Sequence, residues 1–222
     1  FYFRDADWTD SAPSGFTAMS TANLPAPTVT DPSAYFQTIT YAGNGGTLSI
    51  PLPEDASGTD VVMDLWWMKG RSVATFPAIH DSVRGTQKVI LSSENDLQAT
   101  NGELTSFNDG SGNLTLVRAA ARDEINRSSE TYVGWGWKAG GAPSADNTGD
   151  RTPTANSVMV DGVSTTTSNF FASADIYPTR ASIGSHGVSI LTYTGQGDTK
   201  SLATGLSTKP DVAIFKRLGT DG

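Results

Sequence analysis

The sequence predicts an all-β fold, an antiparallel β-sandwich, and three observations lead to this prediction. The composition leans to Thr, Ser, Gly, Asn and Asp, and strong helix formers are sparse. Short runs of alternating or continuous apolar residues recur roughly every ten residues, a spacing typical of antiparallel sandwiches. Clusters rich in glycine, proline and asparagine separate these runs and indicate turns.

The N-terminal 34 residues are expected to be a tail and a linker. Pro13, Pro25, Pro27 and Pro32 exclude a continuous helix or a central strand there. Residues 1–3 alternate into an acidic stretch and are predicted to be the last strand of a preceding domain.

Strand signals begin after residue 34. Strands are predicted over residues 48–52, 61–68, 88–91 and 114–117. The first alternates apolar and polar residues and is expected to be half-buried. The second is apolar on both faces apart from Asp64, which predicts a central strand buried on both sides. A turn is expected over residues 108–113.

A further strand carries tryptophan on one face and glycine on the other. Val133, Trp135 and Trp137 share one face, while Gly134 and Gly136 leave the opposite face bare. Bare glycines in a strand predict a bulge or the close approach of another backbone.

The remaining elements are a loop, a hairpin and a short helix. Residues 140–154 are expected to be an exposed loop. Residues 157–164 predict a hairpin whose tip, Asp161-Gly162, is the favoured pair for a type I′ turn. The only stretch with helical character is residues 119–127.

The chain contains an internal repeat. Ile39–Thr47 resembles Leu191–Thr199, and each is followed by a strand-like run that ends in lysine. The paired tyrosines, Tyr41 and Tyr193, are 152 residues apart. We therefore expect a first β-sandwich repeat over residues 35–182 and the beginning of a second copy, still incomplete, over residues 183–222. We also expect the chain to be a piece of a longer string of modules.

Charge and composition exclude several classes of function. Fifteen basic and 23 acidic residues give a net charge of −8, so binding to nucleic acid or to an anionic membrane is not expected. The absence of cysteine excludes disulfides and thiolate chemistry. No apolar stretch approaches the ~20 residues of a membrane helix, so membrane insertion is not expected.

Several short motifs occur in an order that resembles a known family. They are Tyr41-Ala42-Gly43-Asn44-Gly45, Trp67-Met68-Lys69, His80-Asp81-Ser82-Val83-Arg84-Gly85, Leu91-Ser92-Ser93, Thr105-Ser106-Phe107 and Tyr132-Val133-Gly134-Trp135-Gly136-Trp137-Lys138-Ala139-Gly140. This order resembles a repeat domain of unknown function found in virion structural proteins of marine bacteriophages, cyanophages especially. Residues 13–25 resemble the end of a SPRY-like lectin-sandwich domain that often precedes this repeat.

The resemblance implies a setting rather than a reaction. We expect a lectin- or jelly-roll-like sandwich in a phage virion structural protein, in a tail fibre, appendage or surface component that acts by assembly and adhesion. Its expected location is the virion. Its expected partners are other virion proteins and copies of itself in a homo-oligomer. The alternatives are a module that binds host-surface glycan and a fibre enzyme that degrades polysaccharide.

The candidates for catalysis are weak, so no catalytic residue is predicted and the chain is not expected to be an enzyme. His80, Asp81 and Arg84 form the nearest constellation, and we interpret Asp81 and Arg84 as a structural ion pair. Asp64 is expected to be buried and to accept hydrogen bonds from backbone N–H groups, rather than to act as an acid with a raised pKa.

No metal site or cofactor is predicted, although two loops offer oxygen ligands for Ca²⁺. These are residues 108–113 and residues 146–150, and neither has the spacing of an EF-hand. We interpret both as plain turns, with a Ca²⁺ site as the alternative.

Tryptophans are the candidates for sugar stacking, because an exposed indole binds the apolar face of a pyranose ring. The residues considered are Trp66, Trp67, Trp135 and Trp137. Trp67 and Trp135 have apolar neighbours and are interpreted as core residues. The predicted glycan-stacking residues are therefore Trp66 and Trp137, together with Trp8 in the polar N-terminal segment.

Overall fold

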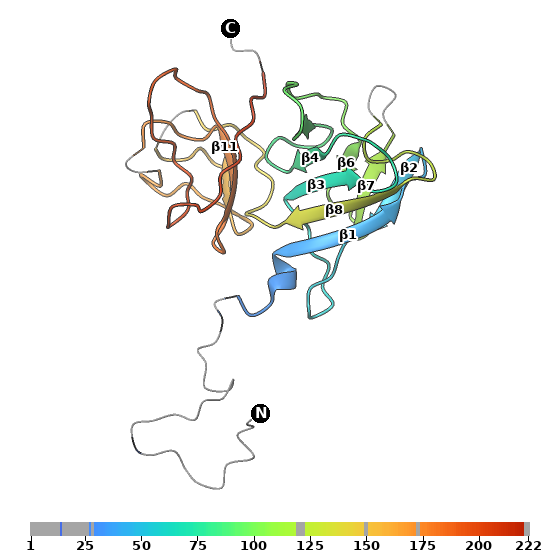
Figure 1. Cartoon of the computed structure of the whole chain (residues 1–222). Coiled ribbons are helices and arrows are strands. Elements are labelled where there is room, and N and C mark those ends of the chain that lie inside the picture. Colours follow the sequence, from blue (N-terminus) through green and yellow to red (C-terminus); the bar gives the residue numbers. More distant parts are fainter. Residues whose placement is uncertain are drawn as a thin grey trace. The chain divides into compact units, whose positions relative to one another are not determined.

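A computed structural model describes residues 29–118, 123–148, 151–171 and 174–219, together with residues 14 and 27 (Figure 1). The predictions for residues 1–13 and 15–26 lie outside the described residues, and so does Trp8. Residues 31–222 form one compact unit that contains three β-sheets. No helix in the described part of the chain is long and apolar enough to cross a membrane.

Two antiparallel sheets pack face to face and form a sandwich. The larger sheet contains, in spatial order, β1 (Phe36–Ala42), β8 (Thr131–Trp137), β3 (Leu65–Gly70), β4 (Ala78–Asp81) and β5 (Ile90–Leu91). The smaller sheet contains β2 (Thr47–Pro51), β7 (Asn113–Val117) and β6 (Leu104–Ser106). The strand β8 lies between β1 and β3 and pairs with both, although it follows them by many residues in the sequence.

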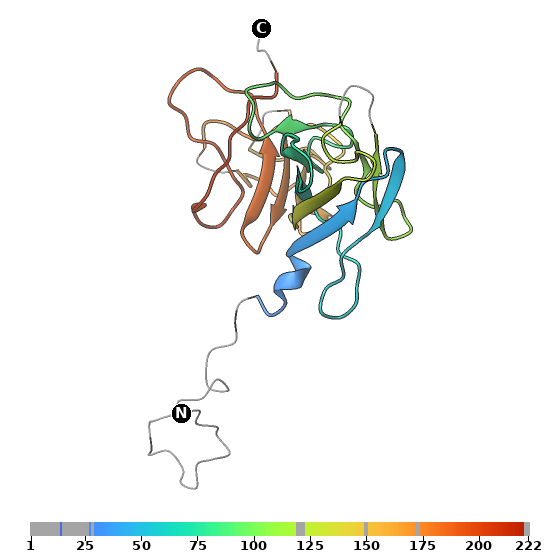
Figure 2. The same cartoon turned by 45° about the vertical axis from the view of Figure 1, so that its right-hand side comes forward.

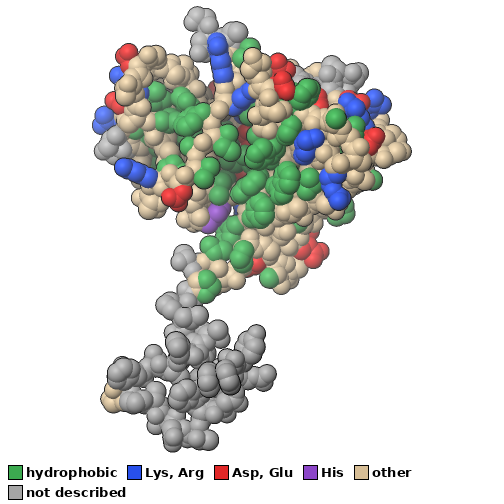
Figure 3. All heavy atoms as spheres, in the orientation of Figure 1, with side chains coloured by type: hydrophobic (Ala, Val, Ile, Leu, Met, Phe, Trp, Pro, Cys, Tyr) green, Lys and Arg blue, Asp and Glu red, His purple; other side chains and the backbone are tan. Residues whose placement is uncertain are grey.

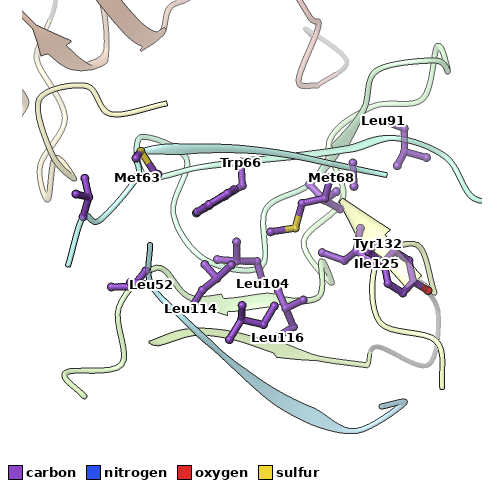
Figure 4. Close-up of a cluster of buried hydrophobic side chains, with 14 residues drawn as sticks. Leu52, Met63, Trp66, Met68, Leu91, Leu104, Leu114, Leu116, Ile125 and Tyr132 are labelled. Atoms are coloured by element: carbon purple, nitrogen blue, oxygen red, sulfur yellow. The ribbon is translucent and has the colours of Figure 1, made fainter. Parts of the chain in front are cut away.

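The core of the sandwich lies between these two sheets (Figure 4). Trp66 and Met68 point from β3 towards leucines of the smaller sheet, such as Leu104 and Leu114. The buried members of the cluster are Ile50, Leu52, Val61, Met63, Trp66, Met68, Ala78, Val89, Leu91, Leu104, Leu114, Leu116, Ile125 and Tyr132. Alternation along β3 and β8 therefore decides which side chains face this core.

The glycines of β8 make room for one large side chain. A Cβ atom on Gly136 would lie 2.8 Å from the Trp66 ring, and one on Gly134 would lie 3.3 Å from it. The sequence predicted the close approach of a backbone or a bulge, but the β1–β8 and β3–β8 registers run without a shift. The prediction is corrected: what approaches the glycines is the indole of Trp66.

A third sheet has its own small core. It contains β10 (Val163–Ser164), β9 (Val158–Val160), β11 (Arg180–Gly184) and β12 (Val188–Thr192), with β11 and β12 in orange in Figure 2. The pairing of β9 with β11 is parallel, and the other pairings are antiparallel. Val158, Phe171, Ala181 and Ile183 form the buried cluster of this sheet.

The predicted fold class is confirmed, and so are several predicted elements. The described residues form an all-β sandwich, with a 3₁₀ turn, η3 (Pro32–Ala34), directly before β1. The strands predicted over residues 48–52, 88–91 and 114–117 correspond to β2, β5 and β7. The hairpin of β9 and β10 turns at Asp161 and Gly162, whose φ angles of 46° and 86° are those that a type I′ turn requires.

Two predicted elements are wrong. The strand predicted over residues 61–68 begins only at Leu65; it is central, as expected, but only its inner face is fully buried. The helix predicted over residues 119–127 is not formed by its described part, residues 123–127. The backbone N–H groups of Glu124 and Ile125 donate instead to the carboxylate of Glu103 at 2.9 Å.

The predicted boundary between the two repeats lies inside one sheet. The predicted boundary between residues 182 and 183 falls within β11, and β11 pairs with β12 along its whole length. Residues 188–192 of the predicted second copy, which form β12, are therefore bonded through the backbone to residues 180–182 of the predicted first copy.

Candidate functional site

The outer face of the larger sheet carries three partly exposed tryptophans. Trp67 on β3 is paired with Trp135 on β8, and Trp137 lies two residues further along β8. Phe36 on β1 is paired with Trp137 and is 43% exposed. We call Phe36, Trp67, Trp135 and Trp137 the tryptophan face. Figure 3 shows hydrophobic side chains gathered over the strands labelled β1, β8 and β3 in Figure 1.

The rings of the tryptophan face form two adjacent pairs. The ring centroids of Phe36 and Trp137 lie 5.1 Å apart, and those of Trp67 and Trp135 lie 6.4 Å apart in an edge-to-face arrangement. The indole N–H of Trp67 donates to the Ser92 hydroxyl at 3.1 Å, which fixes the orientation of that ring.

A shallow groove runs over these rings. It encloses about 450 Å³ and is lined by Trp67, Lys69, Pro77, Trp135 and Trp137. Lys69 is the only charged residue in this lining. The groove therefore combines flat apolar rings with one ammonium donor, a combination suited to a ligand with apolar faces and hydroxyl groups.

The structure corrects the choice of tryptophans made from the sequence. Trp66 was predicted to stack on sugar, but it is fully buried, so that prediction is wrong. Trp137 was also predicted and lies on the tryptophan face. Trp67 and Trp135 were interpreted as core residues, but they lie partly exposed on the same face. The glycines of β8 were the sequence signal that could have identified the buried tryptophan. They leave one face of β8 without side chains, and Trp66 packs against that face.

The predicted ion pair between Asp81 and Arg84 is confirmed. The Arg84 Nε atom lies 2.5 Å from Asp81 Oδ2, both side chains are buried, and the Arg84 backbone N–H donates to Asp81 Oδ1. Arg84 also donates to the carbonyl of Ile79 at 2.9 Å. The pair therefore shapes the turn that follows β4.

His80 is a buried core residue on β4. Its Nδ1 atom donates to the carbonyl of Lys88 at 3.0 Å, and its Nε2 atom has no partner among the described residues. Burial, together with the charge of Arg84, lowers the pKa of His80 to about 3, so the ring is neutral at physiological pH. Asp81 bonds to Arg84 and not to this ring.

The predicted role of Asp64 is also confirmed. Its carboxylate is buried and accepts bonds from the Ser82 hydroxyl at 2.7 Å and from the backbone N–H groups of Ala139 and Gly141 at 2.7 and 3.3 Å. These bonds fasten the chain that leaves β8 to the start of β3. A cavity of about 220 Å³ adjoins Asp64, Ser82 and Asp161. Asp161 accepts a bond from the Ser185 N–H at 2.9 Å.

Glu103 is an unusual acid that sequence reasoning missed, because no local pattern marks it. Its side chain is 2% exposed, and Oε1 has no hydrogen-bond partner among the described residues. Burial raises the pKa of Glu103 to about 7, despite the two backbone donors on Oε2. Glu103 lines neither of the two concave sites described above.

The described carboxylates of the two loops considered for Ca²⁺, those of Asp109 and Asp146, are engaged in hydrogen bonds and an ion pair. Asp109 Oδ1 accepts the N–H groups of Ser111 and Asn113 at 2.8 and 3.2 Å, which closes the turn before β7. These donors hold the pKa of Asp109 below its usual value. Asp146 forms an ion pair with Arg180 on β11. Among the described residues, no three acidic or histidine side chains are placed to share a metal ion.

The fold and the site together define an all-β sandwich protein with an aromatic outer face on its larger sheet. The chain belongs to the family of the domain of unknown function DUF7483, whose model matches residues 31–175. No curated protein and no solved structure matches the chain.

Proposed function

We propose that this chain is a structural and adhesive module of a phage virion, in a fibre, an appendage or another surface component. The resemblance of its ordered motifs to virion repeat domains supports this setting. The sandwich fold supports it as well, because a β module joined through β11 and β12 to the expected second repeat is suited to a string of modules. Other virion proteins and copies of the chain are its proposed partners.

The tryptophan face is the proposed adhesive surface, and its proposed ligand is a glycan of the host surface. The observation that supports this role is the shallow groove lined by Trp67, Trp135 and Trp137. It lies on a face of the larger sheet that no described strand covers. Pyranose rings present C–H faces that pack on indoles. Lys69 lines the same groove; its ammonium group donates to the Gly70 carbonyl at 3.3 Å and has further protons for a sugar hydroxyl or carboxylate.

We also propose that the chain binds without catalysing a reaction. Hydrolysis of a glycosidic bond in most enzyme families uses two acids that flank the bond in an accessible cleft. Asp64 and Asp161 adjoin one cavity, but both oxygens of Asp64 are engaged and Asp161 holds the backbone of Ser185. The raised-pKa acid, Glu103, is buried away from both concave sites.

Removing one ring of the tryptophan face is expected to weaken glycan binding. We expect Trp135→Ala to reduce affinity for host lipopolysaccharide or capsule about tenfold, because an aromatic contact contributes up to about 1.5 kcal/mol beyond the apolar area that it buries. The measurement is calorimetric titration with purified glycans, supported by a glycan array. Tyr193→Ala is the matched control, since Tyr193 is 39% exposed and lies outside the groove. Equal affinities for the two variants would exclude the tryptophan face as the binding surface.

The structural role has an independent test. We expect the full-length protein to be found in purified virions by mass spectrometry and to form homo-oligomers in solution, as symmetric assembly predicts. Light scattering and native mass spectrometry would measure the oligomeric state. A monomeric protein that is absent from virions would contradict the proposal.

A further inference from the structure

The register of the larger sheet shows which side chains share its outer face with the tryptophans. Trp67 is paired with Trp135 and with Ile79, and residues directly opposite each other in neighbouring strands point to the same side of a sheet. The outer positions are Phe36, Thr38, Thr40 and Ala42 on β1, Thr131, Val133, Trp135 and Trp137 on β8, Leu65, Trp67 and Lys69 on β3, Ile79 and Asp81 on β4, and Ile90 on β5. Lys69 and Asp81 are the only charged residues in this set.

The charge of Asp81 is compensated, so Lys69 sets the charge of this face. Asp81 is buried and forms its ion pair with Arg84. Lys69 is half-buried and forms no ion pair with a described acidic group. No acidic residue lines the groove, although the chain contains 23 acidic residues and has a net charge of −8. The tryptophan face is therefore a positive site on a negative protein.

The ammonium group lies beside the tryptophan rings along the direction of the strands. Lys69 pairs with Val133 across β3 and β8, and the next outer pair along these strands is Trp67 with Trp135. The Cα atoms of Val133 and Trp137, four residues apart on β8, are separated by about 13 Å. A short chain of sugars that lies along β8 would therefore cover Trp135 and Trp137 while one of its substituents reaches Lys69.

The same face also offers neutral hydrogen-bonding groups. The indole N–H groups of Trp135 and Trp137 have no partner among the described residues. The hydroxyls of Thr38 and Thr40 also have none there, and both threonines are exposed. These groups can bind the hydroxyls of any sugar, so they do not distinguish an acidic glycan from a neutral one. Lys69 is the group on this face that can.

We propose that the glycan bound by the tryptophan face is acidic, and that Lys69 selects it by donating to a sugar carboxylate. This inference rests on the proposed glycan-binding function and names the class of glycan. Its basis is charge complementarity: a carboxylate gains a charge-assisted hydrogen bond at Lys69, whereas the negative charge of the rest of the chain repels it. A neutral sugar gains only stacking and neutral hydrogen bonds in the same groove.

The test compares acidic oligosaccharides with uncharged forms of the same sugars. Oligomers of galacturonic, glucuronic and mannuronic acid are placed on an array, each beside its methyl ester, which keeps the rings and removes the charge. We expect the 222-residue chain to bind an acid about fivefold more tightly than its ester in calorimetric titration at low salt, the upper range for an exposed ion pair. The preference should disappear in about 1 M NaCl, where the Debye length is about 3 Å.

Three variants assign the preference to one side chain. Lys69→Met keeps an apolar stem and removes the charge, so the ratio of the two affinities should fall to about one. Lys69→Arg keeps the charge and should keep the preference. Lys209→Met is the matched control, because it changes the net charge equally and Lys209 is exposed and lies outside the groove. It should leave the ratio as it is in the wild type.

Three results would overturn the proposal. Equal affinity of the wild type for acids and esters, or binding of neutral glycans alone, would mean that the face does not select charge, and the glycan-binding function would stand. A preference that survives Lys69→Met would place the selecting group elsewhere. Binding to no member of the array, acidic or neutral, would contradict the proposed function and this inference together.

Discussion

Replacing Trp66 with alanine is expected to lower the free energy of unfolding by about 4 kcal/mol, the usual cost of removing a buried tryptophan. Trp66 is fully buried and fills the space above Gly134 and Gly136. The glycines cannot close this space, since they have no side chains to move into it. The measurement is urea unfolding followed by far-UV circular dichroism, so that the loss of a fluorophore does not affect the readout.

The adjacent residue provides the matched control. Trp67 lies on the opposite face of β3, and we expect Trp67→Ala to cost only about 1 kcal/mol because its ring is partly exposed. Trp66→Phe is expected to cost less than Trp66→Ala, since the indole N–H of Trp66 has no partner in the described part of the chain. Equal losses for Trp66→Ala and Trp67→Ala would mean that the inner and outer faces of β3 are wrongly assigned.

The pH dependence of stability is expected to change when Glu103 is replaced by glutamine. The pKa of Glu103 is raised from 4.5 to about 7, so between these pH values the folded protein holds a proton that the unfolded chain has released. Raising the pH through this window therefore destabilises the wild-type protein, by roughly 3 kcal/mol when complete. Glu103→Gln stays neutral, so its stability relative to the wild type should rise by that amount.

A comparison of the wild type with Glu103→Gln is necessary because His80 also makes the stability of the protein depend on pH. Its pKa is lowered from 6.5 to about 3, so the unfolded chain binds the extra proton and stability falls as the pH decreases through this range. The two residues therefore act in opposite directions between pH 4.5 and 6.5. Urea unfolding of wild type and Glu103→Gln in steps from pH 4.5 to 8 isolates the glutamate. A constant difference between them would contradict a buried neutral Glu103.

Local features of the chain were predictable from the sequence. The alternating pattern of β2 and the Asp161-Gly162 turn are set by neighbouring residues, and both occur as expected. The same holds for the Asp81–Arg84 pair, whose partners are three residues apart. The helix predicted near residue 124 failed because its backbone N–H groups bind the distant Glu103 carboxylate, and no local pattern encodes that contact.

The site was predicted less well, because adjacent residues of a strand point to opposite faces of the sheet. Trp66 and Trp67 are adjacent and chemically identical, and apolar neighbours surround both. Which of them faces the core depends on β8, which pairs with β3 from about 70 residues away in the sequence. The order β1-β8-β3 follows from long-range pairing, and the alternation within one strand does not determine it.

The central position of β8 has a consequence for the order of events during synthesis. Thr131 follows Ala42, the end of β1, by 89 residues, so β1 and β3 leave the ribosome long before the strand that joins them. At ordinary elongation rates this delay lasts on the order of 10 s. During that time β1 has no strand partner among the described residues, and β3 has only β4. Chaperone binding or misassociation between neighbouring nascent chains then competes with folding. In a polypeptide with several such repeats, each repeat would pass through the same delay between the synthesis of its first strand and that of its β8 counterpart.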